Sequence, residues 1–237
     1  MQRAPTDNEK RHTLMRELIN KINKLATELL ETLSNSSDKG RYFLGITGCP
    51  AAGKSMLAKN LTDEINSRTG DDLAAVVPMD GFHLPNSILK QRAFLNIKGA
   101  PETFDVDSFV KLINRLHEFP DRSIKCPAYD RKIHDPVENS ITIKPCNRLI
   151  IVEGNYLLLN VPPWNTIRTK MNEVWYIDTP LKTVKEQLLR RHIAGGTSKK
   201  EAERKVESVD LPNAELVKKT FLLADKIVKL SNQFKME

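Results

Sequence analysis

The chain of 237 residues contains only three cysteines, Cys49, Cys126 and Cys146, and no pair of them has the Cys-x-x-Cys spacing of a metal or redox site. This sparse set excludes a disulfide-stabilised scaffold and is typical of a reducing compartment. No apolar run reaches the roughly 18 residues that span a bilayer. The first residues lack the apolar stretch of a secretory signal, and acids among the basic residues argue against a transit peptide. We expect a cytoplasmic protein, with the nucleus as a second compartment and no membrane partner.

Composition places the chain among ordinary globular proteins. Hydrophobic residues make up 40% and charged residues 28%, which excludes a largely disordered or collagen-like chain. The 37 basic residues outnumber the 30 acidic ones, so the formal net charge is +7. This excess favours anionic ligands such as nucleotides. Because acids interrupt every long basic run, we expect no nucleic-acid partner.

The N-terminal part is predicted to be a helix with one apolar stripe. After a loose start over residues 1–8, apolar residues recur at steps of three and four through 9–33. We expect this stripe to pack on the main domain, with a partner-binding or membrane-surface helix as the alternative. Residues 34–40 read as a loop. The division is therefore a helix and linker over 1–40 and a main domain over 41–237.

From residue 41 onward, short apolar runs alternate with helical patterns, which is typical of βαβ units and a mostly parallel sheet. The stretch from about 82 to 146 is rich in proline and interrupts this alternation, so we expect it to supply the substrate side of a site. The predicted strands are Tyr42–Thr47, Leu73–Met79, Arg148–Val152, Glu173–Ile177 and Lys226–Leu230. The predicted helices are Lys54–Ser67, Asp107–Glu118, Leu181–Ile193, Lys199–Val206 and Asn213–Leu222.

A phosphate-binding motif follows the first predicted strand. The motif G-x-x-x-x-G-K-S/T is matched, with a strand before it and a helix after it, by Gly48-Cys49-Pro50-Ala51-Ala52-Gly53-Lys54-Ser55. In such a loop, backbone N–H groups and the helix N-terminus surround a phosphate. Lys54 is expected to neutralise the β- and γ-phosphates and the Ser55 hydroxyl to bind Mg²⁺. Cys49 lies inside the loop, where a passive role is expected and redox sensitivity is the alternative.

Two acids follow predicted strands at the edge where an open α/β sheet binds its ligands. Glu153 ends the strand Arg148–Val152 and is predicted to help bind Mg²⁺, with a helix cap or surface acid as the alternative. Asp80 follows the strand Leu73–Met79 and is predicted to be the base for an attacking hydroxyl, with a turn-forming acid as the alternative. His83 is either a substrate contact or a structural residue. Since the guanine-reading Asn-Lys-x-Asp is missing, ATP is favoured over GTP as the nucleotide.

Together with the phosphate loop, four further segments resemble the phosphoribulokinase/uridine kinase family of P-loop small-molecule kinases. The resemblance runs in order from about residue 41 to 231. The segments are Met79-Asp80-Gly81-Phe82-His83-Leu84-Pro85-Asn86, Lys98-Gly99-Ala100-Pro101-Glu102-Thr103-Phe104-Asp105, Pro127-Ala128-Tyr129-Asp130-Arg131 and Ile151-Val152-Glu153-Gly154-Asn155-Tyr156-Leu157-Leu158. The family implies a P-loop NTPase fold with a five-stranded, mostly parallel sheet flanked by helices, Mg-ATP as donor and a small hydroxyl compound as acceptor. It is also compatible with a homo-oligomer.

The resemblance also implies roles for individual residues. Tyr129 and His134 resemble the pair with which uridine kinases hold the base ring, and Arg131 joins the substrate contacts. Arg190 and Arg191 fall where the family's lid, here about 190–206, supplies arginines to the transferred phosphate; a solvated helix end is the alternative. Asn213, in Asp210-Leu211-Pro212-Asn213, matches a loop near the adenine.

The chain departs from uridine kinases at two places. They read Asp-Ser-Phe-Tyr and Asn-Phe-Asp-His-Pro where this chain has Asp80-Gly81-Phe82-His83 and Asn96-Ile97-Lys98-Gly99-Ala100-Pro101. The second departure removes an acid expected on a ribose. We therefore predict a uridine kinase-like enzyme with a nucleoside as the leading acceptor and a pantothenate- or sugar-type acceptor as the alternative. An ATPase without a small acceptor and an RNA-associated nucleotide-binding protein are the rival functions.

Overall fold

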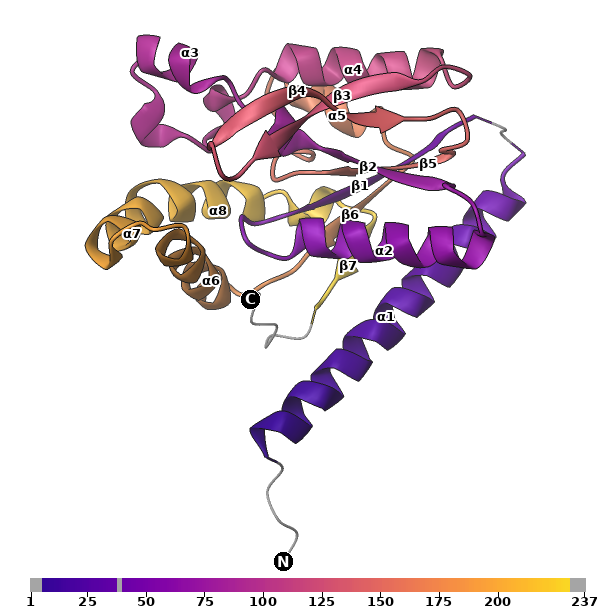
Figure 1. Cartoon of the computed structure of the whole chain (residues 1–237), viewed down its shortest axis with the longest axis horizontal. Coiled ribbons are helices and arrows are strands. Elements are labelled where there is room, and N and C mark those ends of the chain that lie inside the picture. The colour runs from indigo at the N-terminus through magenta and orange to yellow at the C-terminus, as the bar shows by residue number, and fades with distance from the viewer. Residues whose placement is uncertain (1–5, 38–39, 231–237) are drawn as a thin grey trace, which may run out of the picture.

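The computed structural model describes residues 6–37 and 40–230, and its centre is a five-stranded parallel sheet. The strands lie in the order β2-β5-β1-β6-β7 (Figure 1). Their bounds are β1 Tyr42–Gly48, β2 Ala74–Pro78, β5 Leu149–Glu153, β6 Glu173–Ile177 and β7 Lys226–Val228. The predicted α/β fold with five strands at these positions is confirmed. The strand ends differ by one or two residues, because Met79 opens a 3₁₀ turn and Glu153 still belongs to β5.

Helices cover both faces of this sheet. Their bounds are α1 Asp7–Asn35, α2 Lys54–Thr69, α3 Asn86–Gln91, α4 Val106–Glu118, α5 Asn165–Arg168, α6 Leu181–Ala194, α7 Lys199–Lys205 and α8 Leu211–Lys218. Short 3₁₀ turns are η1 Met79–Phe82, η2 Leu95–Ile97, η3 Pro101–Thr103 and η5 Phe221–Leu223, and η4 Val206–Asp210 is a π-helical turn. The prediction of a loop over Asp210–Asn213 is wrong, because α7, η4 and α8 follow one another directly.

Two apolar cores lie on opposite faces of the sheet, since successive side chains of a strand point to opposite sides. Leu44 and Ile46 of β1 face the core beneath α1, α2 and α6. Phe43 of the same strand faces the other core, beneath α4 and α5. This alternation determines the face of the sheet on which each side chain lies.

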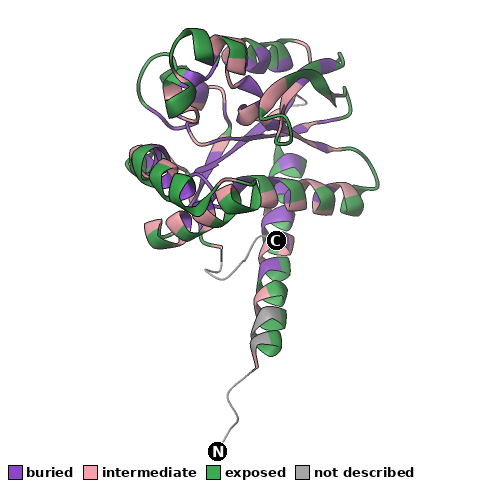
Figure 2. Ribbon diagram, turned by 60° about the vertical axis from the view of Figure 1, so that its left-hand side comes forward, coloured by how far each residue is buried: buried purple, intermediate pink, exposed green. Residues whose placement is uncertain are grey.

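The N-terminal helix α1 packs against α2, and its apolar stripe is buried from Leu18 onward. Leu18, Ile22, Leu25, Leu29 and Leu33 are buried. The helix is longer than the predicted span of 9–33 because Thr6 caps it, with its side chain accepting from Glu9 N and Glu9 reaching back to Thr6. Its first turns extend beyond the rest of the molecule (Figure 2). Among the described residues, no helix is long and apolar enough to cross a membrane.

The predicted irregular stretch from about 82 to 146 contains an ordered antiparallel hairpin. Its strands are β3 Ile124–Asp130 and β4 Asp135–Ile143, joined by a turn over residues 131–134. The sequence did not predict these strands because Pro127 and Pro136 lie within them, and proline disfavours a strand. The register shifts between Cys126 and Ala128, so Pro127 occupies an irregularity in the ladder.

Candidate active site

The phosphate loop connects β1 to α2 by a tightly turned backbone. Ala51 and Gly53 have positive φ values of 59° and 95°. A Cβ atom on Gly48 would lie 2.8 Å from the carbonyl oxygen of Ile177 on β6, so this position needs glycine. The loop therefore lies at the carboxyl end of the sheet, with the N-terminus of α2 beside it, as a phosphate cradle requires.

Lys54, the first residue of α2, is buried and folds back over the loop. Its Nζ donates a hydrogen bond of 2.9 Å to the carbonyl oxygen of Cys49. Burial lowers the pKa of Lys54, and the nearby carboxylates of Glu153 and Asp80 oppose that shift. A desolvated ammonium beside two acids is well placed to compensate phosphate charge.

Glu153 and Ser55 meet at the end of β5. Ser55 Oγ donates a hydrogen bond of 3.1 Å to Glu153 Oε1. In the sheet register, Glu153 pairs with both Ile46 of β1 and Pro78 of β2, so it lies between the two strand ends that carry the loop and Asp80. Burial and the charge of Asp80 raise the pKa of Glu153 to about 7, against the opposing effects of Lys54, the Ser55 hydrogen bond and Arg131.

Asp80 follows β2 in the turn η1 and is half-buried. Its carbonyl oxygen accepts from His83 N at 3.2 Å and lies 2.8 Å from His83 Nδ1. The neighbouring Gly81 lets the hairpin approach closely, because a Cβ atom there would lie 2.4 Å from the carbonyl oxygen of Pro127. Asp80 is thus enclosed between the phosphate loop and the hairpin.

Three rings are in contact on the hairpin side of Asp80. The ring of His83 contacts those of Phe104 and Tyr129 in tilted arrangements, at centroid distances of 4.0 and 4.8 Å. The Nζ of Lys98 lies 5.2 Å from the centroid of the Tyr129 ring. Burial, followed by the charges of Asp80 and Asp135, raises the pKa of Tyr129 to about 12, so its hydroxyl stays protonated.

His134, which the family resemblance pairs with Tyr129, occupies the turn of the hairpin with a φ of 53°, and its side chain is exposed. Its carbonyl oxygen accepts hydrogen bonds from Asn86 Nδ2 at 3.0 Å and from Lys98 Nζ at 2.7 Å. The histidine ring in contact with Tyr129 is that of His83.

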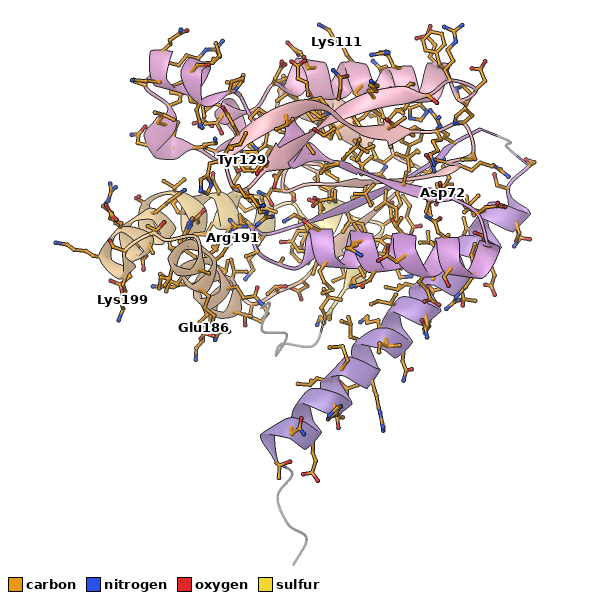
Figure 3. The ribbon with its side chains drawn as sticks, in the orientation of Figure 1. Asp72, Lys111, Tyr129, Glu186, Arg191 and Lys199 are labelled. Carbon is orange, nitrogen blue, oxygen red and sulfur yellow. The ribbon has the colours of Figure 1, made fainter. Side chains whose placement is uncertain are left out.

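The two predicted lid arginines differ in their surroundings. The charge of Arg191 interacts with those of Arg131, Asp210 and Asp80. Figure 3 shows Arg191 and Tyr129 at the same end of the sheet, on α6 and on the hairpin. Arg190 and Arg191 are both exposed. The interaction with the charge of Asp80 is what connects Arg191 to the site.

Sequence reasoning did not find a side-chain contact between α6 and η4, the pair His192 and Asp210. His192 Nε2 lies 2.7 Å from Asp210 Oδ2, and their side chains are only 12% and 11% exposed. The pair joins α6 to the end of η4. Its only signal in the sequence is that His192 follows the predicted arginines directly.

Cys49 contacts the helix α8, on which Asn213 lies. Asn213 is buried on α8, and the next residue, Ala214, accepts a hydrogen bond of 3.4 Å from Cys49 Sγ at its carbonyl oxygen. Asn213 is therefore close to the phosphate loop. Burial raises the pKa of the Cys49 thiol, which disfavours the reactive thiolate.

A cavity of about 490 Å³ lies near the phosphate loop, between α1 and the residues that follow β6 and β7. It is lined by Glu17, Leu18, Lys21, Asp178, Pro180, Lys229 and Leu230. A Cβ atom on Gly53 would lie 3.2 Å from Leu230 Cδ1, so the cavity reaches the loop through that leucine. It contains none of the predicted site residues.

The donor atoms at the loop fit Mg²⁺. The hydroxyl of Ser55 and the carboxylate of Glu153 are hard oxygen ligands. The described residues contain no cluster of three or more histidine, cysteine or acidic side chains that could hold a metal. This suits an ion that takes one or two protein ligands and completes its shell with phosphates and water.

No family model matches the chain, but comparison with individual known proteins finds relatives. A protein of Schizosaccharomyces pombe named "Putative uridine kinase" is 33% identical over 198 residues, which cover 80% of this chain and 83% of that protein. A pantothenate kinase of Ligilactobacillus salivarius is 28% identical over 179 residues, covering 75% of this chain and 58% of that enzyme.

Among solved structures, that of a "putative fructose transport system kinase" from Silicibacter sp. TM1040 is 32% identical. It superposes with a TM-score of 0.79 over 87% of this chain and 98% of that one. The fold, the phosphate loop and these relatives agree, and the chain belongs to the phosphoribulokinase/uridine kinase family of P-loop kinases.

Proposed function

We propose that this kinase transfers the γ-phosphoryl group of ATP to a hydroxyl group of a small metabolite, with Mg²⁺ as cofactor. The observation that carries the proposal is the position of Asp80. It lies within charge–charge range of Lys54 and Glu153 on one side and of Tyr129, whose ring contacts that of His83, on the other. A base between a phosphate cradle and a group of aromatic rings suits transfer to a bound acceptor.

The nucleotide is held by the loop from Gly48 to Ser55. The N-terminus of α2 and Lys54 offset the charge of the β- and γ-phosphates. Ser55 and Glu153 would hold Mg²⁺, which when bound neutralises phosphate charge in the transition state. Asn213, buried close to the loop, is assigned to the adenine end.

Asp80 acts on the acceptor hydroxyl. The hydroxyl oxygen forms a bond to the γ-phosphorus while its proton passes to the Asp80 carboxylate. The bond between that phosphorus and the bridging oxygen breaks, and its electron pair leaves with ADP. Arg191 offsets negative charge on the moving phosphoryl group, in a step that depends mainly on positioning and electrostatics.

The names of the relatives leave three acceptor types for this pocket: a nucleoside, pantothenate and a sugar. A coupled assay of ADP release tests the proposal, with Mg-ATP and separate additions of uridine, cytidine, pantothenate, fructose, ribulose 5-phosphate and glycerate. We expect ADP release that depends on one acceptor class and a phosphorylated product of matching mass. ADP release that no acceptor in this panel or in a metabolite extract stimulates would support an ATPase instead.

A further inference from the structure

Positive charge collects at the acceptor side of the site from three separate parts of the chain. Lys98 follows η2, Arg131 begins the hairpin turn, and Lys205 ends α7. The charges of Lys98 and Lys205 both act on His83, and that of Arg131 acts on Tyr129. The ring centroids of His83 and Tyr129 lie 4.8 Å apart, and Lys98 Nζ lies 5.2 Å from that of Tyr129, so the three charges converge on one pair of rings.

None of these three cations forms an ion pair with a carboxylate in the part of the chain that the structure describes. Lys98 instead donates to two neutral oxygens, Asn86 Oδ1 at 2.6 Å and the carbonyl of His134 at 2.7 Å. Lys205 is half-buried on the lid. Each ammonium or guanidinium group thus retains charge that a ligand can use.

The acids nearby do not balance this charge. Asp135 acts on Lys98 and Tyr129, and its Oδ1 accepts from the backbone N–H of Asn86 at 2.9 Å. Asp80 is the base of the proposed reaction, and Glu153, on which the charge of Arg131 also acts, is assigned to Mg²⁺. Lys54 and Arg191 are assigned to the phosphates of ATP, so they do not account for the three cations at the acceptor side.

We propose that the acceptor carries an anionic group, a carboxylate or a phosphate, in addition to the hydroxyl that receives the phosphoryl group. Lys205 binds this group, with Lys98 and Arg131 beside it. The inference rests on the proposed function and narrows its substrate class. It departs from the nucleoside expected from the sequence, because an uncharged acceptor gains nothing from three cations.

The test separates metabolites by charge before assaying them. A deproteinised metabolite extract is passed over an anion-exchange resin, and the flow-through and the salt-eluted fractions are desalted. Each receives the full-length protein, Mg²⁺ and ATP labelled at the γ-phosphate, and labelled products other than nucleotides and inorganic phosphate are counted. We expect the acceptor in a retained fraction, and treating that fraction with a phosphatase that is then removed distinguishes a phosphate from a carboxylate.

Labelled product only from the flow-through would overturn the anionic acceptor and leave the kinase intact. Labelled product from no fraction, by protein that still binds ATP, would overturn the proposed function itself. The two failures are therefore distinguishable.

Lysine variants on one helix locate the anion site. Lys205→Gln removes the proposed contact, whereas Lys199→Gln changes a side chain on the same helix that is 80% exposed and labelled at the outer end of the lid in Figure 3. With the retained fraction as acceptor, we expect Lys205→Gln to raise the apparent KM for acceptor about tenfold, the effect of losing one charge-assisted contact. The KM for ATP stays unchanged, and Lys199→Gln behaves as the unmodified protein. Equal KM values for acceptor in Lys205→Gln and Lys199→Gln would overturn the assignment to Lys205.

Discussion

Ser55 Oγ donates a hydrogen bond of 3.1 Å to Oε1 of Glu153, which joins the first turn of α2 to the end of β5. The carboxylate is buried and Asp80 lies near it, so two acids share one region of low polarity with Lys54. The metal-binding and acceptor-activating parts of the proposed mechanism are therefore electrostatically coupled, and each can be perturbed separately.

The raised pKa of Glu153 predicts a specific dependence of stability on pH. Burial, with the charge of Asp80, moves this pKa from 4.5 to about 7 in the folded protein. Between these values the folded state binds the proton more tightly than the unfolded chain, so the contribution of Glu153 to stability falls as pH rises. Glu153→Gln cannot ionise and escapes this loss.

We expect Glu153→Gln to gain about 1–3 kcal/mol over the unmodified protein between pH 5 and pH 8. Thermal unfolding of the nucleotide-free proteins measures this as a Tm difference that widens with pH. Glu186→Gln, at the exposed position labelled on α6 in Figure 3, serves as the matched control and should show no such trend. A Tm difference that stays constant across this pH range would contradict the assigned pKa.

The adjacent lid arginines are predicted to differ in function. Both are exposed, and the charge of Arg191 interacts with those of Asp80 and Asp210. We expect Arg191→Ala to lower kcat about 100-fold or more, as the loss of one donor to a developing charge does. Arg190→Ala removes the same charge from the same helix and should change kcat less than about threefold. Steady-state rates at saturating ATP and acceptor decide between them, and equal losses would contradict the assignment.

His83 and His134 are predicted to differ in their effect on acceptor binding. Because the ring centroids of His83 and Tyr129 lie 4.8 Å apart and the side chain of His134 is exposed, we expect His83→Ala to raise the KM for acceptor about three- to tenfold. His134→Ala should leave that KM nearly unchanged. A larger effect from His134 would show that the hairpin turn moves onto the acceptor, and thermal unfolding of both variants controls for stability.

Apolar periodicity was sufficient to predict the central sheet, because its inner strands β1, β5 and β6 are short, almost fully buried runs. The same periodicity did not predict the hairpin, because its strands contain Pro127 and Pro136. Pro127 lies at the register shift between Cys126 and Ala128. The glycine that replaces the serine of uridine kinases also has a tertiary cause. At Gly81, the carbonyl oxygen of Pro127 leaves no room for a side chain.

The candidate site could be predicted where its residues follow strands directly. Asp80 and Glu153 come after β2 and at the end of β5, and parallel strands bring such positions to one edge. Lys98, Lys205 and His192 lie outside that rule. Their places depend on how the hairpin and lid pack, for which the sequence has no periodic signal.

The central claim is that Asp80 activates an acceptor hydroxyl beside a nucleotide held by Lys54. The most direct measurement compares the unmodified protein, Asp80→Asn and Lys54→Ala for ATP binding by calorimetry and for acceptor-dependent ADP release. Asp72→Asn, whose ion-paired and exposed side chain lies at the opposite end of the sheet, serves as control (Figure 3).

The account predicts that Asp80→Asn binds ATP normally and loses at least about 100-fold in kcat, the usual contribution of a general base. Lys54→Ala should lose both ATP binding and transfer, and Asp72→Asn should lose neither. Unchanged turnover in Asp80→Asn would contradict the account.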